Sequence, residues 1–328
     1  MTELTRRMGL TGAIAFGWLM PWSRRAMAQA YPERPIRIIV GGAPGSVPDT
    51  LARVIADRLA AALKQAVIVE NRPGAAGSIA IGAMLAAKPD GHTLALATMS
   101  QAVFNTYLFS KQAYDPLRDF APVSLLATGA MALAAHPGFR ADTFRQFVDL
   151  AKAQPGRISL GTTAIGSPPH VFCNLMVRAA GIDVTIVPHT SGAEGMMGVV
   201  RGDVQLFLDA PTIISPQAAA RTVKVLVVTG QSREKAFPDV VTIAEAGLPE
   251  ATAEAWIGLV ASAQTPPKLV ERLSQSLMEM LAADEVRQKL QTLSFVTTGS
   301  TPGEFGKRIR DDHARWGPVI TAAAIKLE

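Results

Sequence analysis

The sequence predicts an α/β protein built on parallel strands, and three observations carry that prediction. Short apolar runs rich in β-branched residues recur along the chain. The early runs are followed by a Gly/Pro segment and then by apolar residues at helical spacing, which is the order of strand, loop and helix. Beyond the first thirty residues, no stretch of about eighteen uninterrupted apolar residues predicts a membrane span. Repetition of the unit predicts a parallel sheet with helices on both faces.

The first strand, loop and helix set the pattern. Ile36–Val40 is predicted as a strand, Gly41–Asp49 as a loop, and the residues from Thr50 to Leu63 as a helix. Asp49 stands where an N-cap is expected, and capping alone is the alternative to a ligand-binding role. Backbone N–H groups at a helix start favour a carboxylate or a phosphate. The glycine spacing matches neither the dinucleotide fingerprint nor the P-loop, which argues against a nucleotide ligand.

The alternation of strand, loop and helix continues to residue 98, and two consecutive strands are predicted further along the chain. The next predicted elements are a strand at Val67–Val69, a glycine-rich loop at Glu70–Ser78, a helix from Ile79 to the turn Lys88–Gly91, and a strand at Thr93–Thr98. Two strand-like runs then follow in succession, Pro122–Ala127 and Ala130–Ala135, with Thr128-Gly129 between them. Two strands without a helix between them break the rhythm, so we expect a crossover between two domains here.

The strand and helix alternation resumes in the middle of the chain. We expect helices at 144–153, 168–180 and 193–201, and strands at 158–160, 184–187, 204–208 and 223–228. The apolar run Ala255–Ala261 is the candidate for the return crossover. The tail is predicted to be helical, with Thr265 capping a helix that starts at the following prolines and Thr301–Glu304 spaced as a capping box.

The first thirty residues have the organisation of an export signal. Thr5–Leu10 contains two arginines and resembles a twin-arginine motif, and an apolar run follows it. Ala28–Ala30 supplies a small-x-small cleavage site. A membrane anchor is the alternative, but the apolar run is short and Pro21 follows it. We therefore expect residues 1–30 to be cleaved near Ala30 and the mature protein to be periplasmic.

Composition and charge narrow the function classes. The chain has 328 residues, of which 48% are hydrophobic and 18% charged, so it is globular and long enough for two domains. The formal net charge is +5, and four arginines and one glutamate in the predicted signal account for +3 of it. The remaining +2 is too small to indicate nucleic-acid binding.

The sequence offers little for catalysis. Its five histidines are scattered without metal-ligand spacing, and it lacks a G-x-S-x-G elbow. Ser232–Lys235 matches S-x-x-K in a polar loop, and we attribute this short match to chance. The single Cys173 excludes an internal disulfide and lies in an apolar helical stretch, which predicts a buried structural thiol. We expect no enzyme activity, no metal and no cofactor.

The recurring feature is a glycine-rich loop that leads into a helix. A third such loop, Gly161–His170, follows the strand predicted at 158–160. Loops at the carboxyl ends of parallel strands are where open α/β sheets bind ligands. Any one of these loops is also compatible with an ordinary βα turn, but their number favours a binding protein whose two domains hold a small acid between them.

Several motifs, in order and spacing, resemble the Bug-type periplasmic solute-binding proteins of tripartite tricarboxylate transporters. The resemblance runs from Tyr31 to the C-terminus. The motifs that carry it are Val69–Gly77, Lys88–Leu94, Tyr114–Pro116, Asp119–Ser124, Phe237–Val240 and Ala244–Pro249. The resemblance implies a type II periplasmic binding protein fold with two α/β lobes, each a mostly parallel sheet flanked by helices, and two crossing segments. Lobe 1 would comprise residues 31–129 and 255–328, and lobe 2 residues 130–254.

The resemblance also implies a ligand site and partners. In the family, backbone amides and waters from the first loop and from the loop that corresponds to Gly161–His170 hold carboxylates. The implied ligand-binding residues are Pro44, Gly45, Ser46, Val47 and Asp49 in the first lobe, Gly161, Thr162, Ser167, His170 and Asp209 in the second, and Ala76, Gly77, Ser78, Thr98 and Ser100 around the rim. The implied partners are a small carboxylate and the membrane subunits of a transporter, and the chain is expected to be a monomer.

The sequence departs from the family pattern at the predicted loops. Gly41–Pro44 replaces the usual proline, aromatic residue and two prolines, which loosens the backbone. Pro48 and Pro168-Pro169 stand where relatives have residues with an N–H group, and each proline removes a donor. We expect the ligand or its binding geometry to differ from the dicarboxylate norm. His189 replaces a tyrosine, either as a pH-sensitive group in the cleft or as a satisfied surface histidine.

Two other functions remain compatible with the sequence. A ligand sensor that signals to a membrane histidine kinase would have the same fold and site. An exported hydrolase would need a nucleophile and a base, and the sequence shows no such pair.

Overall fold

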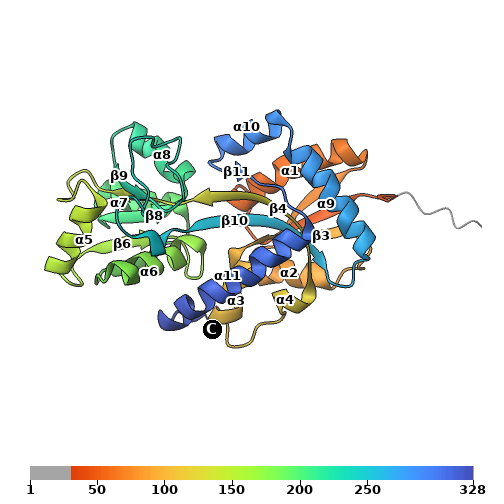
Figure 1. The fold of residues 1–328 in the computed structure, drawn as a ribbon, viewed down its shortest axis with the longest axis horizontal. Helices are drawn as coiled ribbons and strands as arrows, with labels where there is room; N and C mark the ends of the chain where they lie inside the picture. The colour runs from red at the N-terminus through yellow and green to blue at the C-terminus, as the bar shows by residue number, and fades with distance from the viewer. Residues whose placement is uncertain (1–30, 328) are drawn as a thin grey trace, which may run out of the picture.

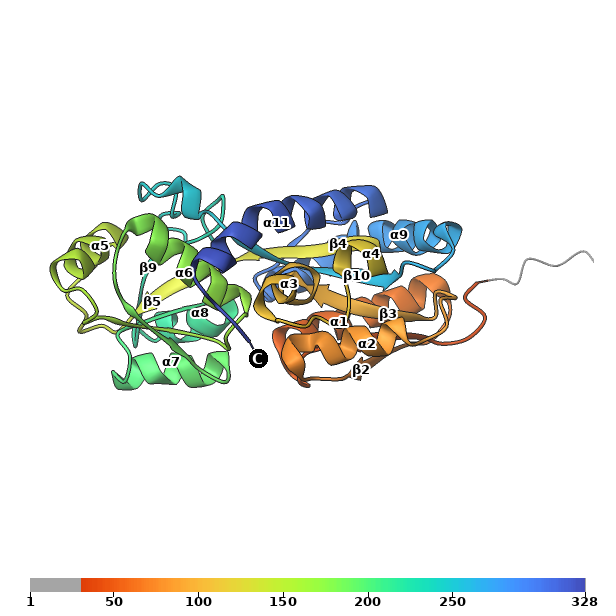
Figure 2. The same ribbon diagram turned by 90° about the horizontal axis from the view of Figure 1, so that it is seen from below.

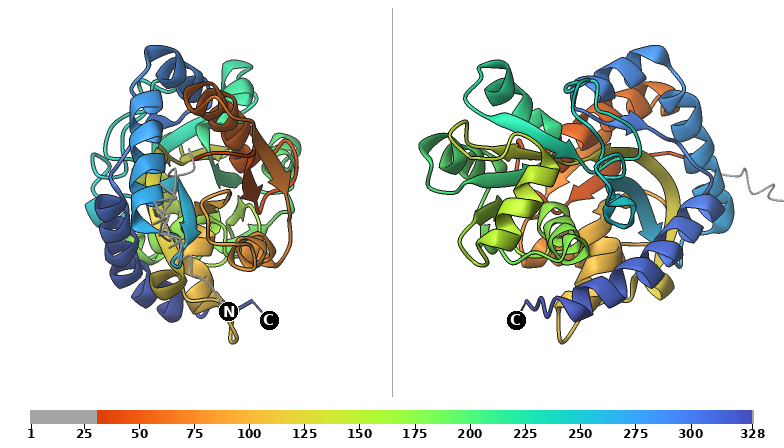
Figure 3. Two further views of the ribbon diagram at one scale, coloured as in Figure 1. Left: turned by 90° about the vertical axis from the view of Figure 1, so that its right-hand side faces the viewer. Right: turned by 60° about the vertical axis from the view of Figure 1, so that its left-hand side comes forward.

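The computed structural model describes residues 31–327, so the predicted export signal at residues 1–30 lies outside the described residues. The described chain forms two lobes that lie side by side and are joined by two long strands, β4 (Phe120–Ala130) and β10 (Glu254–Ser262) (Figures 1 and 2). Lobe 1 is built around a six-stranded sheet and lobe 2 around a five-stranded sheet. The orange N-terminal and blue C-terminal segments share lobe 1, whereas lobe 2 is green (Figure 3).

The sheet of lobe 1 has the strand order β11-β4-β10-β3-β1-β2. Strand β1 pairs in parallel with β2 and β3, and β10 pairs antiparallel with both β3 and β4. Alternate residues of β1 face opposite sides, since Ile38 belongs to one apolar cluster and Ile39 to another. The remaining strands are β1 (Ile36–Val40), β2 (Val67–Asn71), β3 (Thr93–Thr98) and β11 (Val296–Thr297).

Helices cover both faces of this sheet. The face that includes Ile38 packs against α1 (Val47–Leu63), α9 (Pro267–Leu281) and α10 (Asp284–Thr292). The face that includes Ile39 packs against α2 (Ser78–Leu85), α3 (Asn105–Leu108) and α11 (Pro302–Ala322), and a short α4 (Pro116–Asp119) leads into β4. The capping box predicted at the start of the last helix is confirmed between Thr301 and Glu304.

The sheet of lobe 2 has the strand order β7-β6-β8-β5-β9. Leu206 and Leu208 face the cluster that contains α5 and α6, whereas Phe207 faces α7 and α8. The strands are β5 (Ala132–Ala135), β6 (Ser159–Thr162), β7 (Thr185–Pro188), β8 (Leu206–Asp209) and β9 (Lys224–Val228). The helices are α5 (Phe144–Ala153), α6 (Pro168–Ala180), α7 (Gly192–Arg201) and α8 (Pro211–Ala219).

The prediction of a two-lobe α/β fold is confirmed, and each sheet is mixed. β1, β2 and β3, like β6, β7 and β8, form the parallel part. β10 enters the lobe 1 sheet from lobe 2, and β5 enters the lobe 2 sheet from lobe 1, so each pairs antiparallel with both of its neighbours. β4 starts in lobe 1 and runs in the same direction as β3.

The predicted strand break at Thr128-Gly129 is wrong. Strand β4 continues through both residues, and the chain changes sheets at Met131. Gly129 serves close packing instead of a turn, because a Cβ there would lie 3.2 Å from the Phe295 ring and 3.2 Å from the Ser294 carbonyl oxygen. A glycine inside a strand thus marks an approach of another segment.

The start of α9 also differs from the prediction. The helix begins at Pro267 and its N-cap is Pro266, which makes no side-chain cap, so Thr265 lies one residue too early to cap it. Pro267 at the first helical position is compatible with the helix because the N–H it lacks would have no partner within the helix.

Thr229 is hydrogen-bonded to both of the segments that cross between the lobes. Its hydroxyl accepts the Met131 N–H at 2.9 Å and donates to the Ala253 carbonyl at 2.7 Å. Its own N–H donates to the Met131 carbonyl at 2.8 Å, and its carbonyl accepts the Ala253 N–H at 2.8 Å. Because Thr229 is 1% exposed, these four bonds form away from water at the point where the chain passes between lobes.

Aromatic packing also joins the lobes. Helix α11 runs from lobe 1 towards lobe 2 (Figure 1) and carries the fully buried Trp316. Trp316 stacks on Phe172 of α6 with ring centroids 5.0 Å apart, and its edge meets Phe104 of lobe 1 at 5.7 Å. One apolar cluster therefore continues from lobe 1 into lobe 2.

The prediction of a buried structural thiol is confirmed. Cys173 lies in α6, is fully buried and forms no disulfide, and this burial raises the pKa of its thiol. Within residues 31–327, no helix combines the length and the apolar character that crossing a membrane requires.

Candidate functional site

The predicted site residues lie at or after the carboxyl ends of β1, β2, β3, β6 and β8, on the sides of the two lobes that meet. The two lobes are in direct contact there, because the Ser100 hydroxyl of lobe 1 donates to the Gly166 carbonyl of lobe 2 at 3.1 Å. Gly166 has φ +81°, and a Cβ at this position would lie 2.6 Å from the Leu108 side chain. We call this region the interlobe junction.

The helix after the first loop begins earlier than predicted. Ser46 is the N-cap of α1, so the prediction of Asp49 as N-cap is wrong. Pro48 explains the difference, because a proline ring fixes a helical φ and is well accommodated in the first turn, where its missing N–H costs nothing. Asp49 is consequently the third helical residue, and its side chain folds back onto the loop.

Asp49 organises the first loop. One carboxylate oxygen accepts the Gly45 N–H at 2.8 Å and Arg53 Nε at 3.1 Å, and the other accepts Asn71 Nδ2 at 2.9 Å. Burial would raise the pKa of Asp49, but the hydrogen bonds from Arg53, Gly45 and Asn71 outweigh it and hold the pKa below its ordinary value. The Gly45 N–H is therefore occupied, whereas the Ser46 hydroxyl is buried without a hydrogen-bond partner.

The second loop contacts the first and contains strained backbone. A Cβ on Gly41 would lie 2.7 Å from the Gly77 Cα, so glycine allows the two loops to touch. Gly74, Ala75, Ala76 and Gly77 all have positive φ, with 45° at Ala75 and 49° at Ala76. Left-handed alanines cost free energy, and such strain is characteristic of functional sites.

Gln101 and Asn105 hold this loop in place. Gln101 Oε1 accepts the Thr98 N–H at 2.8 Å and its Nε2 donates to the Ala76 carbonyl at 2.9 Å. Asn105 Nδ2 donates to Ser78 Oγ and to the same Ala76 carbonyl, both at 3.2 Å. Neither residue is among those predicted from the sequence. In the sequence, the signal is a pair of amides four positions apart, a spacing that places both side chains on one side of a helix. In the structure both are buried, Gln101 in a π-helical turn and Asn105 in the helix that follows it.

Replacing Ala76 with glycine should stabilise the protein. Glycine adopts φ 49° without steric cost, so we expect Ala76→Gly to raise the free energy of unfolding by about 0.5 to 1 kcal/mol. The matched control is Ala83→Gly in α2, which should lower it by about 1 kcal/mol because glycine weakens a helix interior. Urea unfolding measures both changes, and a loss of stability in Ala76→Gly would contradict the strain.

In the lobe 2 loop Gly161–His170, the polar groups described here bond to one another. Ser167 is the N-cap of α6, and its hydroxyl accepts the His170 N–H at 3.4 Å and bonds Thr163 Oγ1 at 2.9 Å. Pro168 and Pro169 have no N–H to offer. Thr162 is fully buried in β6, and Gly161 beside it packs against Phe207. Burial lowers the pKa of His170 below its ordinary value.

Asp209 lies at the end of β8, opposite Ala132 and thus beside the crossing segment. It is 7% exposed, Oδ1 accepts the Ala210 N–H at 2.7 Å, and Oδ2 is buried with no partner. Burial raises the pKa of Asp209 to about 7. A Cβ on Gly192, the first residue of α7, would lie 2.6 Å from Oδ2, so this glycine makes room for the carboxyl group.

His189 packs at the end of β7. Its N–H donates to the Thr162 carbonyl at 2.8 Å, and its ring Nδ1 lies 3.3 Å from the same oxygen. The ring meets Phe207 edge to face. The structure thus gives His189 protein partners on the lobe 2 side of the junction, in agreement with the satisfied histidine that the sequence analysis weighed.

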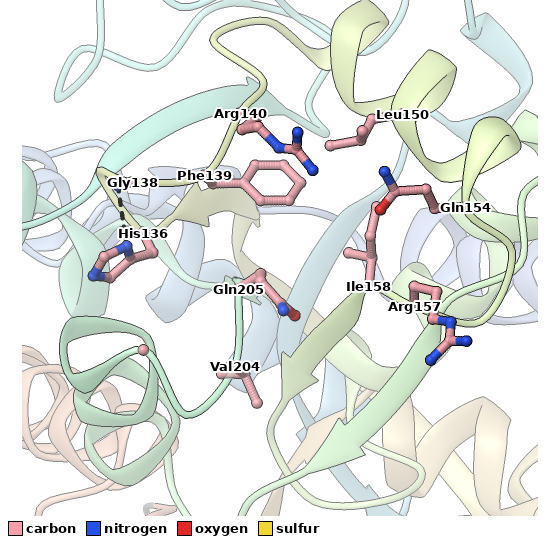
Figure 4. A pocket seen from close by; sticks show the side chains of 11 residues that line it. His136, Gly138, Phe139, Arg140, Leu150, Gln154, Arg157, Ile158, Val204 and Gln205 are labelled. Carbon is pink, nitrogen blue, oxygen red and sulfur yellow. Dashed lines mark hydrogen bonds between the residues drawn. The ribbon is translucent and has the colours of Figure 1, made fainter.

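A pocket of about 320 Å³ lies at the opposite edge of the lobe 2 sheet (Figure 4). His136 follows β5, and Ile158 and Gln205 precede β6 and β8, so this edge faces away from the junction. Arg140 and Arg157 point in different directions and do not converge on a shared point (Figure 4). We assign no function to this pocket.

The fold and the opposed loops define a two-lobe solute-binding protein of the periplasmic type. A family model described as "Tripartite tricarboxylate transporter family receptor" (TctC) matches residues 51–325. The chain belongs to this family, and the Bug-type resemblance predicted from the sequence is confirmed.

Comparisons with individual proteins agree with this assignment. Protein BugT of Bordetella pertussis is 29% identical over 100% of this chain and 99% of its own length. The solved structure of R. palustris Rpa4515 with adipate has a TM-score of 0.82 and 27% identity, and covers 90% of this chain and 99% of that one. MatC (Rpa3494) from Rhodopseudomonas palustris with bound malate has a TM-score of 0.78 and 30% identity, and covers 88% of this chain and 100% of that one.

Proposed function

We propose that this chain binds a small carboxylate between its two lobes and delivers it to the membrane subunits of a tripartite tricarboxylate-type transporter. The observation that carries the proposal is the interlobe junction, where loops at strand ends of both lobes meet at Ser100 and Gly166. A ligand that touches both loops favours the closed arrangement of the lobes because it binds that arrangement better than the open one. The adipate and malate in the related structures support a carboxylate as the ligand.

The proposal includes the organisation of the mature protein. Residues 1–30 form an export signal that is cleaved near Ala30 and directs the chain to the periplasm. Residues 31–129 and 255–328 form lobe 1, residues 130–254 form lobe 2, and the protein acts as a monomer. It performs no chemistry, which is supported by its membership of a family of transporter receptors.

We expect a small carboxylic acid to raise the melting temperature of the mature protein, because a ligand that binds only the folded state stabilises it by mass action. A thermal-shift screen of mono-, di- and tricarboxylates, amino acids and aromatic acids measures this. A screen in which no acid raises the melting temperature would contradict carboxylate binding.

Tryptophan fluorescence can report closure of the lobes on the same ligand. The mature chain has two tryptophans, Trp256 and Trp316, and only Trp316 stacks across the lobes. In a Trp256→Phe variant, saturable ligand binding should change the Trp316 emission. Binding without any change in emission would contradict closure around the ligand.

A further inference from the structure

The contact between the lobes at Gly166 is made by a turn of lobe 2. The Ser167 N–H donates to the Ala164 carbonyl at 3.0 Å, and Gly166 is the third residue of this turn, with φ +81°. Ala164 and Ile165 are exposed, whereas Gly166 is buried. The turn explains the positive φ of Gly166, but its burial requires a neighbouring segment.

Two leucines of lobe 1 cover Gly166. A Cβ on Gly166 would lie 2.6 Å from Leu108 Cδ1 and 3.2 Å from Leu327 Cδ1. A separation of 2.6 Å between carbon atoms is well inside van der Waals contact, so a side chain at this position would force the turn and Leu108 apart. The Ser100 hydroxyl donates to the carbonyl of the same glycine at 3.1 Å. Glycine at position 166 therefore allows the two lobes to meet.

The segment that follows α11 brings Leu327 to this contact. The Leu327 N–H donates to the Leu108 carbonyl at 2.8 Å, and Leu327 forms a parallel bridge with Phe109. Ile325, two residues earlier, is 8% exposed. The segment leaves α11 and passes beside α3 (Figure 2). We call residues 325–327 the strap.

The contact at Gly166 can open with little loss of buried apolar surface. It consists of two leucine side chains and one hydrogen bond, and Leu327 is only half-buried. The stack of Trp316 on Phe172 also joins the lobes, but each of these two rings is 1% exposed. Because exposing large aromatic rings costs more, we expect a motion of the lobes to keep the stack and to break the contact at Gly166.

We infer that Gly166, Leu108 and the strap form a latch that holds the two lobes in the arrangement that binds the ligand. Leu327 is then a positioning residue, which acts on binding through Gly166. A contact made only in the closed arrangement adds to ligand affinity, because it favours the arrangement that the ligand selects. The link to affinity rests on the proposed function, whereas the contact between the lobes does not.

Two matched glycine substitutions test the latch. Gly166→Ala adds a Cβ at the contact, whereas Gly181→Ala adds one at a glycine with φ +60°, where it would meet no other part of the chain within 4 Å. Both variants place an alanine in the left-handed region, but only Gly166→Ala obstructs the lobes. In isothermal titration we expect Gly166→Ala to bind malate or adipate about tenfold or more weakly than Gly181→Ala.

Substitutions in lobe 1 test the other side of the latch. Leu108→Val removes the methyl group that the new Cβ would meet, so in the Gly166→Ala background it should restore affinity to within about threefold of Gly181→Ala. Leu327→Ala should weaken binding about 3- to 10-fold by raising the dissociation rate. The control Lys326→Ala keeps the leucine of the strap and should change the affinity by less than about twofold.

The distance between the lobes gives a second measurement, with and without ligand. Spin labels on Asp57→Cys in α1 and Met197→Cys in α7 report it, since both positions are exposed and Cys173 is buried. We expect Gly166→Ala to lengthen the mean distance relative to Gly181→Ala. A variant that is merely less stable would lower the melting temperature without lengthening this distance.

The outcomes separate the latch from the proposed function. Equal affinities and equal distances in Gly166→Ala and Gly181→Ala overturn the latch. A weakened Gly166→Ala that Leu108→Val does not restore indicates a distorted turn and also overturns it. Equal affinities of Leu327→Ala and Lys326→Ala overturn the role of the strap. If no acid binds in the broader screen either, the proposed function fails, and the distance alone decides: a longer one in Gly166→Ala supports the latch and an equal one overturns it.

Discussion

Replacing Asp209 with asparagine is expected to stabilise the ligand-free protein at neutral to alkaline pH. The pKa of Asp209 is about 7 in the folded protein against 3.8 for a free aspartate. The folded state therefore holds a proton that the unfolded state releases, and this contribution to stability is lost as the pH rises towards 7. By linkage the loss reaches roughly 4 kcal/mol at about pH 8, and the uncharged amide of the Asp209→Asn variant would not incur it.

Urea unfolding at several pH values checks this expectation. The difference in unfolding free energy between Asp209→Asn and the wild type should be small near pH 4 and should grow up to about pH 7. Asp203→Asn is the control because its carboxylate is exposed and paired with Arg201 at 2.9 Å. Parallel stability curves for Asp209→Asn and the wild type would contradict the buried, unpartnered carboxyl group.

Replacing Thr229 with valine is expected to lower the free energy of unfolding by about as much as Asp209→Asn is expected to raise it. Valine keeps the shape of the side chain but leaves the Met131 N–H and the Ala253 carbonyl without their hydroxyl partner. Each buried backbone group without a partner costs about 1 to 3 kcal/mol, so we expect a loss of about 2 to 6 kcal/mol. Thermal and urea unfolding measure the loss.

Thr229→Ser is the matched control for this position. Serine keeps the hydroxyl and removes one methyl group, so the loss should stay near about 1 kcal/mol. Equal losses in the valine and serine variants would show that packing, and not the hydrogen bonds to both crossing segments, makes Thr229 important.

Local patterns in the sequence predict much of the fold. The strand Thr93–Thr98 and the helices at 144–153 and 168–180 have the predicted bounds, because each has a clear period and a cap, a proline or a turn at its ends. The role of a glycine is harder to predict. Gly129 suggests a turn in the sequence, but in the structure it makes room for Phe295, which is distant in the chain. A contact between distant segments, and not a local turn, therefore explains this glycine.

The candidate site is only partly accessible to sequence analysis. The glycine-rich loops and their place at strand ends follow from local patterns. The partners of Asp49 and the absence of partners around Asp209 depend on segments that meet only in the folded chain, such as Asn71 and Gly192. The loss of two donors at Pro168 and Pro169 follows from the sequence, whereas the bond from the His170 N–H to the Ser167 hydroxyl is seen only in the structure.

The strand order of lobe 1 has a consequence for the time at which the chain can fold. Strand β10 lies between β3 and β4, although it begins at Glu254, more than a hundred residues after β4 ends. Until that part of the chain has been synthesised, β3 and β4 each have an unpaired edge, and unpaired edges promote aggregation. The strands of lobe 2 are all available earlier. While the chain is still attached to the ribosome, lobe 2 can therefore have all its strands at a time when lobe 1 still lacks β10.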